Sequence, residues 1–169
     1  DPKQDALYFK PYHIIEKQIR DGSGATSPIK VGFIGFVPPQ IMLWDAKNLE
    51  GKAQTRDILQ AARAWVPHMK EEGADIVIAL SHSGIDGHGE TEGMENASLY
   101  LAGVEGIDAI FTGHQHLVFP GPKDFDNVPG ADAVKGTLLG KPAVMAGFWG
   151  SHMGLIDLLL EKDGSAWKI

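Results

Sequence analysis

The sequence contains no cysteine, which excludes disulfides, thiolate zinc sites and cysteine nucleophiles together. It also lacks any apolar run near the roughly 18 residues of a membrane span, so we expect a soluble, globular protein without membrane contact. Basic residues are in deficit, with 15 Lys and Arg against 22 Asp and Glu and a net charge of −7. This argues against binding polymeric nucleic acid. A small anionic substrate stays possible, because bound divalent cations can reverse the local field.

The 169 residues are enough for one domain with a real core. There is no internal repeat or low-complexity linker. The first five residues are polar, so no signal peptide opens the chain. Either the native protein has none, or the chain is a processed or excised piece. We predict a single domain of mixed α/β class.

Periodicity predicts strands and two helices in alternation. The predicted strands are 12–19, 30–37, 75–81, 108–112, 143–146 and 155–161, and the predicted helices are 55–72 and 94–102. The first two strands should form a hairpin, and Pro67 should kink or interrupt the first helix. The strand 75–81 is continuously apolar, which is typical of a strand covered on both faces.

Three histidines follow the carboxyl ends of two strands that should be neighbours. The order strand, helix, strand over 75–112 predicts a parallel β-α-β crossover. His82 follows its first strand, and His114 and His116 follow its second. Ligands of open α/β sheets bind beyond such carboxyl ends. In an extended segment His114 and His116 would point to the same side, each facing one of two metal ions.

A lone histidine is more often a structural or surface residue than a ligand, and the other four fit that description. His13, His68 and His88 should be solvated or packing residues, and only His152 is kept as an outside candidate. His-x-His spacing at a strand end, joined by His82 at the same edge, favours a metal site. Imidazole suits several transition metals, so the residues do not choose among them.

These stretches resemble the metallophosphatase domain of the 5′-nucleotidase family, within the calcineurin-like metallophosphoesterase superfamily. The match covers nearly the whole chain and is carried by Gly113-His114-Gln115-His116, Ser81-His82-Ser83-Gly84 and 34–42, with 118–121, 135–137 and 142–145. The first motif is specific for the superfamily, and the run 34–42 indicates its cyclic-nucleotide phosphodiesterase branch. The resemblance implies an α/β fold, the αββα sandwich of that superfamily, here as a partial domain.

Carried over by residue, the resemblance implies that His82 and His114 bind one metal and His116 the other, with Gln115 only as the spacer. It implies two divalent metal ions (Mn, Zn, Fe, Ni or Co), a small-molecule nucleotide substrate, and a periplasmic or cell-surface location. The family's Asp-x-His, bridging aspartate and Gly-Asn-His motifs are missing, as is its nucleotide-binding domain. Residues 1–169 therefore look like the C-terminal portion of one metallophosphoesterase domain. The catalytic residues would lie in the absent N-terminal half, so the remainder of the full-length chain is a required partner.

Charge leads to the same expectation. Two divalent ions carry four positive charges, and three neutral imidazoles offset none of them. Asp75 and Asp108 are at the amino ends of their strands, far from the histidines. Asp86 and Glu90 are in the loop after His82, without the spacing of a bridging ligand. The carboxylates should therefore come from another segment of the full protein.

Several alternatives stay open at this point. One is a 5′-nucleotidase or nucleotide-sugar hydrolase of the same family, and another is its sulfur-oxidation relative, which cleaves thiosulfate conjugates. The third is a non-catalytic module whose histidines hold one structural metal or none.

Overall fold

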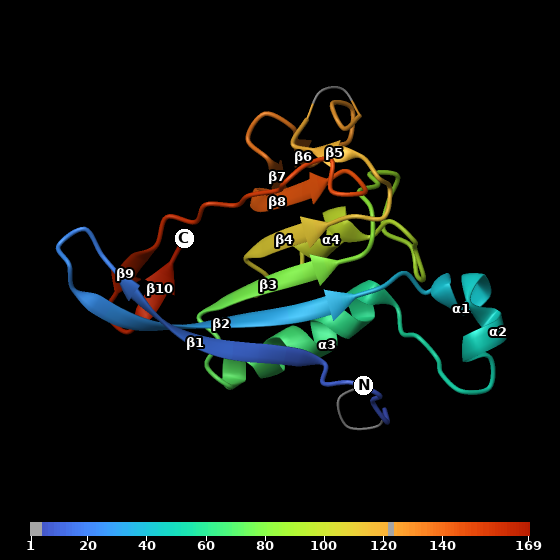
Figure 1. Ribbon diagram of the computed structural model, residues 1–169, viewed down its shortest axis with the longest axis horizontal. Coiled ribbons are helices and arrows are strands. Elements are labelled where there is room, and N and C mark those ends of the chain that lie inside the picture. The colour runs from blue at the N-terminus through green and yellow to red at the C-terminus, as the bar shows by residue number, and fades with distance from the viewer. Residues whose placement is uncertain (1–4, 122–123) are drawn as a thin grey trace.

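The computed structural model describes residues 5–121 and 124–169; residues 1–4, part of the polar opening, and 122–123 lie outside the description (Figure 1). Its main sheet has the strand order β1-β2-β3-β4-β8-β7-β6, with β5 paired to β8, and β9 and β10 form a separate two-stranded sheet. The strands are β1 (Tyr12–Arg20), β2 (Thr26–Phe36), β3 (Ile76–Ser81), β4 (Ala109–Thr112), β5 (Val118–Phe119), β6 (Ala131–Asp132), β7 (Thr137–Leu138), β8 (Lys141–Ala146), β9 (Glu161–Asp163) and β10 (Ala166–Lys168). The helices are α1 (Ile41–Trp44), α2 (Ala46–Leu49), α3 (Ile58–Glu71) and α4 (Ser98–Ala102).

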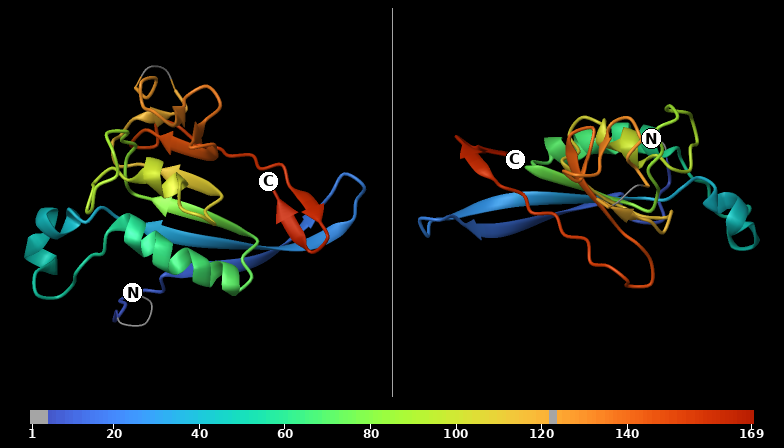
Figure 2. Two further views of the ribbon diagram at one scale, coloured as in Figure 1. Left: turned by 180° about the vertical axis from the view of Figure 1, so that it is seen from behind. Right: turned by 90° about the horizontal axis from the view of Figure 1, so that it is seen from above.

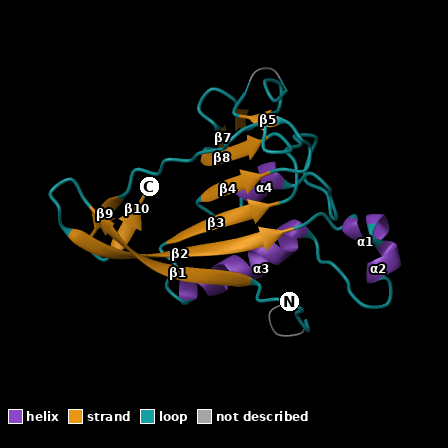
Figure 3. Cartoon of the chain, viewed as in Figure 1, coloured by secondary structure: helices purple, strands orange, loops and turns teal. Residues whose placement is uncertain are grey.

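The centre of the sheet is parallel, and the predicted parallel pairing of strands 75–81 and 108–112 is confirmed. β2 pairs with β3, β3 with β4, and β4 with β8, all in parallel register. β1 and β2 form the predicted antiparallel hairpin. The β3-α4-β4 crossover places the carboxyl ends of β3 and β4 side by side, and loops spread from that edge (Figure 3).

Helices α3 and α4 cover one face of this sheet (Figure 2). α3 begins after Asp57, whose side chain accepts a hydrogen bond from the Gln60 backbone, and buries Ile58, Leu59, Ala62, Val66 and Met69. The helix runs through Pro67, so the predicted break is wrong, while the predicted kink stays a prediction. The proline removes one hydrogen bond of the helix backbone, but apolar contacts on both sides of it hold the helix on the sheet. None of the described helices is long and apolar enough to span a bilayer.

The opposite face of the sheet is only partly covered. Leu80 and Phe111 are opposite each other on β3 and β4, and they remain 45% and 37% exposed. On the same face Ile76 of β3 and Val144 of β8 are only 3% and 7% exposed, so the prediction that strand 75–81 is covered on both faces holds near its amino end and is wrong at Leu80. A sheet with exposed apolar side chains on one face is what half of an αββα sandwich would show.

The predicted last strand, 155–161, is also wrong in its bounds. The structure assigns residues 152–160 to no strand, and pairing begins only at Glu161 in β9. Exposure still alternates along 153–160, with Leu155 and Leu159 more exposed than their neighbours. The sequence has strand periodicity here, but a strand also needs a partner for its backbone groups.

Candidate metal centre

Two of the three predicted histidines meet at the carboxyl edge of the sheet. The His82 backbone N–H donates to the Phe36 carbonyl at 2.9 Å, which ties the start of its loop to β2. His114 follows β4 after Gly113. The ring centroids of His82 and His114 are 5.3 Å apart with an interplanar angle of 63°.

That separation fits two ligands of one metal ion. A tetrahedral ion with metal–nitrogen bonds of about 2.0–2.1 Å holds two imidazole centres roughly 5 Å apart. His82 is exposed and His114 half-buried, so the pair faces the solvent edge and not the core. Two imidazoles leave positions on such an ion for other ligands.

His116 lies apart from this pair in its contacts. Its ring stacks on Phe148, with centroids 5.3 Å apart and an interplanar angle of 25°. Within residues 5–121 and 124–169, no group of three His, Cys, Asp or Glu side chains is arranged to hold a metal ion. The ligand roles of His82, His114 and His116 remain predictions that need groups from outside this chain.

The backbone of Gly113–His116 is a strained turn and not the extended segment we predicted. His114 and His116 have φ of 69° and 60°, in the left-handed region that non-glycine residues seldom adopt. The Gln115 N–H donates to the Gly113 carbonyl at 2.8 Å, so His114 is the central residue of a tight turn. Strand alternation therefore does not orient the two rings. Such strain is characteristic of functional sites, where the surrounding structure has to hold it.

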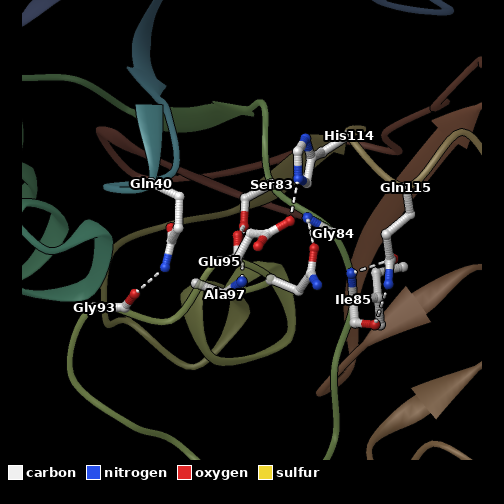
Figure 4. Close-up of polar contacts among 10 residues, drawn as sticks. Gln40, Ser83, Gly84, Ile85, Gly93, Glu95, Ala97, His114 and Gln115 are labelled. Carbon is white, nitrogen blue, oxygen red and sulfur yellow. Dashed lines mark hydrogen bonds and ion pairs between the residues drawn. The ribbon is translucent and has the colours of Figure 1, made fainter. Parts of the chain in front are cut away.

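Gln115 does more than separate two histidines. Its side-chain oxygen accepts a hydrogen bond from the Ile85 N–H at 2.8 Å, and its amide donates to the Ile85 carbonyl at 3.3 Å (Figure 4). A Cβ on Gly84 would be 2.4 Å from the Gln115 side chain, so only glycine fits beneath it. Gln115 thus fastens the turn that carries His114 to the loop that carries His82.

We expect Gln115→Ala to destabilise the chain by about 1–3 kcal/mol, because the buried Ile85 N–H loses its acceptor. Urea unfolding of both proteins measures the difference. Gln18→Ala is the matched control, since Gln18 is exposed on β1 and its replacement should change stability by less than about 0.5 kcal/mol. An alanine variant as stable as the parent sequence would contradict this role.

Buried hydroxyl groups also form hydrogen bonds with the loop after His82. Ser83 Oγ donates to the Glu95 carbonyl and accepts from the Ala97 N–H, both at 2.7 Å. Ser98 Oγ and Thr112 Oγ1 both donate to the Ser83 carbonyl. These contacts join the ends of β3 and β4 to the start of α4, and they hold the backbone next to both histidines in place.

Sequence reasoning missed Glu95. Its Oε1 is 2.6 Å from His114 Nε2, the closest carboxylate contact that the structure gives a candidate ligand (Figure 4). The predicted helix 94–102 starts only at Ser98 in the structure. Residues 94–97 are instead held by Ser83 and Gly84 through hydrogen bonds of Glu95, Asn96 and Ala97. No spacing in the sequence marks such a contact across 19 residues.

The acidic residues considered from sequence have other partners. Asp75 accepts from the Lys30 N–H, and Asp108 accepts from Lys70 and the Val77 N–H, all at the amino end of the sheet. The backbone N–H of His88 lowers the pKa of Asp86, and Arg63 lowers that of Glu90. These carboxylates stabilise the chain itself.

The remaining histidines have other contacts, and the outside candidacy of His152 stays a prediction. His13 is exposed on β1, His68 pairs with Glu71, His88 with Asp86, and His152 contacts Ser151.

The chain belongs to the calcineurin-like phosphoesterase family, whose model matches residues 8–118. It is 49% identical over its whole length to the 2′,3′-cyclic-nucleotide 2′-phosphodiesterase/3′-nucleotidase of Salmonella typhimurium, of which it covers 26%. The enzyme of the same name from Haemophilus influenzae is 49% identical over 162 residues, which are 24% of that protein. The resemblance to the cyclic-nucleotide branch is thus confirmed.

The crystal structure of calcineurin-like phosphoesterase YfkN from Bacillus subtilis matches 99% of this chain with a TM-score of 0.93 and 47% identity, over 50% of that chain. The predicted fold class is confirmed, as is the partial domain. The chain spans about a quarter of the length of the curated relatives named above.

Proposed function

We propose that the chain is the C-terminal portion of the metallophosphoesterase domain of a larger enzyme that hydrolyses nucleotide phosphoesters. The substrates proposed are 2′,3′-cyclic nucleotides and 3′-nucleotides, and the observation that supports this is the His82–His114 pair at the carboxyl edge of a family fold. The names of the relatives from Salmonella and Haemophilus support the cyclic-nucleotide preference.

In this proposal His82 and His114 bind one divalent ion and His116 a second. Bound divalent ions would lower the pKa of a water nucleophile and stabilise charge on the phosphoryl oxygens. The residues of this chain would bind and orient the metal ions. The hydrogen bonds of Gln115 and Ser83 hold the loops that carry His82 and His114 in place. The carboxylates, the general acid and the nucleobase contacts come from the rest of the protein. We further propose a periplasmic or cell-surface location, by analogy with the family.

The test uses the full-length protein that contains this sequence. We expect turnover of 2′,3′-cyclic AMP and 3′-AMP to exceed that of 5′-AMP, and chelator dialysis to abolish it until Mn²⁺ or Co²⁺ is restored. Preference for 5′-AMP would favour a 5′-nucleotidase instead. Activity that survives complete metal removal would contradict the proposal, since imidazoles alone supply no Lewis acid.

A further inference from the structure

The contact between Glu95 and His114 has no role in the function proposed so far. The 2.6 Å separation of Glu95 Oε1 and His114 Nε2 is short for a nitrogen–oxygen hydrogen bond, as expected when the acceptor is a carboxylate. Glu95 is half-buried, with 42% of its side chain exposed, and the His114 side chain is 19% exposed. The bond is thus partly shielded from competing water.

The backbone that carries Glu95 is fixed to the loop after His82. The Glu95 carbonyl accepts from Ser83 Oγ at 2.7 Å. The next residue, Asn96, accepts from the Gly84 N–H through its side chain at 3.1 Å. The carboxylate therefore has a set position relative to both histidines, and it does not reach His114 by chance from a free loop (Figure 4).

The His114 ring is also held from its face. Trp44 of α1 stacks on it, with ring centroids 5.2 Å apart and an interplanar angle of 23°. The stacked indole restricts the ring plane, and the carboxylate selects one of the two ring orientations that share this plane and differ by a flip about the Cβ–Cγ bond. An ionised carboxylate only accepts, so a neutral His114 ring bonded to it carries its proton on Nε2 and has its lone pair on Nδ1.

We propose that Glu95 is the positioning residue for His114: it fixes the Nε2–H tautomer and aims Nδ1 at the metal ion. This rests on the proposed function, which makes His114 a ligand. Histidine ligands generally donate their second N–H to a carboxylate or carbonyl, which sets the tautomer and strengthens the ligand. Glu95 touches neither metal nor substrate in this role, and acts only through the imidazole.

The experiment measures Co²⁺ affinity of the full-length protein by competition with a chromophoric chelator, together with the visible Co²⁺ spectrum. Glu95→Ala should weaken one of the two Co²⁺ sites by about 10–100-fold and shift its absorption bands. Glu95→Gln keeps an accepting oxygen and should recover most of the affinity. Glu92→Ala is the matched control, a carboxylate of the same loop that contacts Gln60 and should bind Co²⁺ like the wild type.

The outcomes separate the two proposals. Wild-type affinity and spectrum in Glu95→Ala, with loss of binding in His114→Ala, would overturn the positioning role and leave the proposed function intact. Equal losses in Glu95→Gln and Glu95→Ala would also overturn it, because they would make the carboxylate a direct ligand. Full Co²⁺ binding in His114→Ala would instead contradict the proposed function. A thermal unfolding curve for each variant excludes general unfolding as the cause of a loss.

Discussion

His114→Ala in the full-length protein is expected to lower the hydrolysis of bis(p-nitrophenyl) phosphate by more than about 100-fold. Loss of a residue that merely orients a ligand costs about 10–100-fold, and loss of the ligand itself should cost more. The ring centre of His114 is 5.3 Å from that of His82, so its removal leaves His82 as the sole imidazole of the pair. The same variant should lose bound metal, measured by elemental analysis alongside turnover.

The matched control is His88→Ala. His88 lies in the loop between His82 and His114 and pairs with Asp86, so its loss removes an exposed histidine from the same region. Activity should stay at the wild-type level. Retained activity and metal content in His114→Ala would refute the ligand role of the Gly-His-x-His motif here.

Leu80→Asp should strongly destabilise the full-length protein while changing the 169-residue chain little. In this chain Leu80 is 45% exposed, beside Phe111, on the face of the sheet opposite α3 and α4. If the absent half of the domain covers that face, aspartate there becomes a buried charge without a partner, which costs roughly 3–5 kcal/mol. In the isolated chain the same aspartate is about half exposed and keeps contact with water, so it should cost less, about 1–2 kcal/mol.

Denaturant unfolding of both lengths of protein measures this difference. Val134→Asp is the control, since Val134 is 95% exposed in a distant turn and its replacement should change stability by less than about 0.5 kcal/mol in either protein. Equal, small effects of Leu80→Asp in both lengths would mean that nothing covers this face. The sandwich proposed for the complete domain would then be wrong.

The segment 153–160 also exposes apolar side chains that a complete domain could cover. Its alternating exposure is that of a strand, and apolar side chains such as Leu159 remain in water. The period of the sequence predicts a strand over 155–161, and this prediction is wrong over 155–160, where the structure has no strand. The exposed side chains of Leu80 and Phe111 and this segment are therefore the places where a complete domain should add contacts.

The pairing of His82 and His114 could be predicted because it follows from chain topology. Two apolar runs joined by a helix become adjacent parallel strands, and residues after their carboxyl ends come together. The left-handed turn at His114 could not be predicted in the same way, because side-chain periodicity describes only regular structure. The extended conformation predicted for His114–His116 is therefore wrong.

Glu95 and Gln115 escaped sequence reasoning for a related reason. Both act through contacts between loops, Glu95 with His114 and Gln115 with Ile85. Such contacts depend on the irregular path of residues 82–97, which local propensity does not encode. The sequence predicts a helix from residue 94, which would include Glu95. In the structure the hydrogen bonds with Ser83 and Gly84 replace the first turn of that helix, so Glu95 lies in a loop.

The most direct test of the metal site is anomalous diffraction from crystals of the full-length protein grown with Mn²⁺ or Co²⁺. We predict two anomalous peaks about 3.5–4 Å apart, one bonded to His82 and His114 and the other to His116. Peaks elsewhere, with His82 and His114 bound to no ion, would contradict the account.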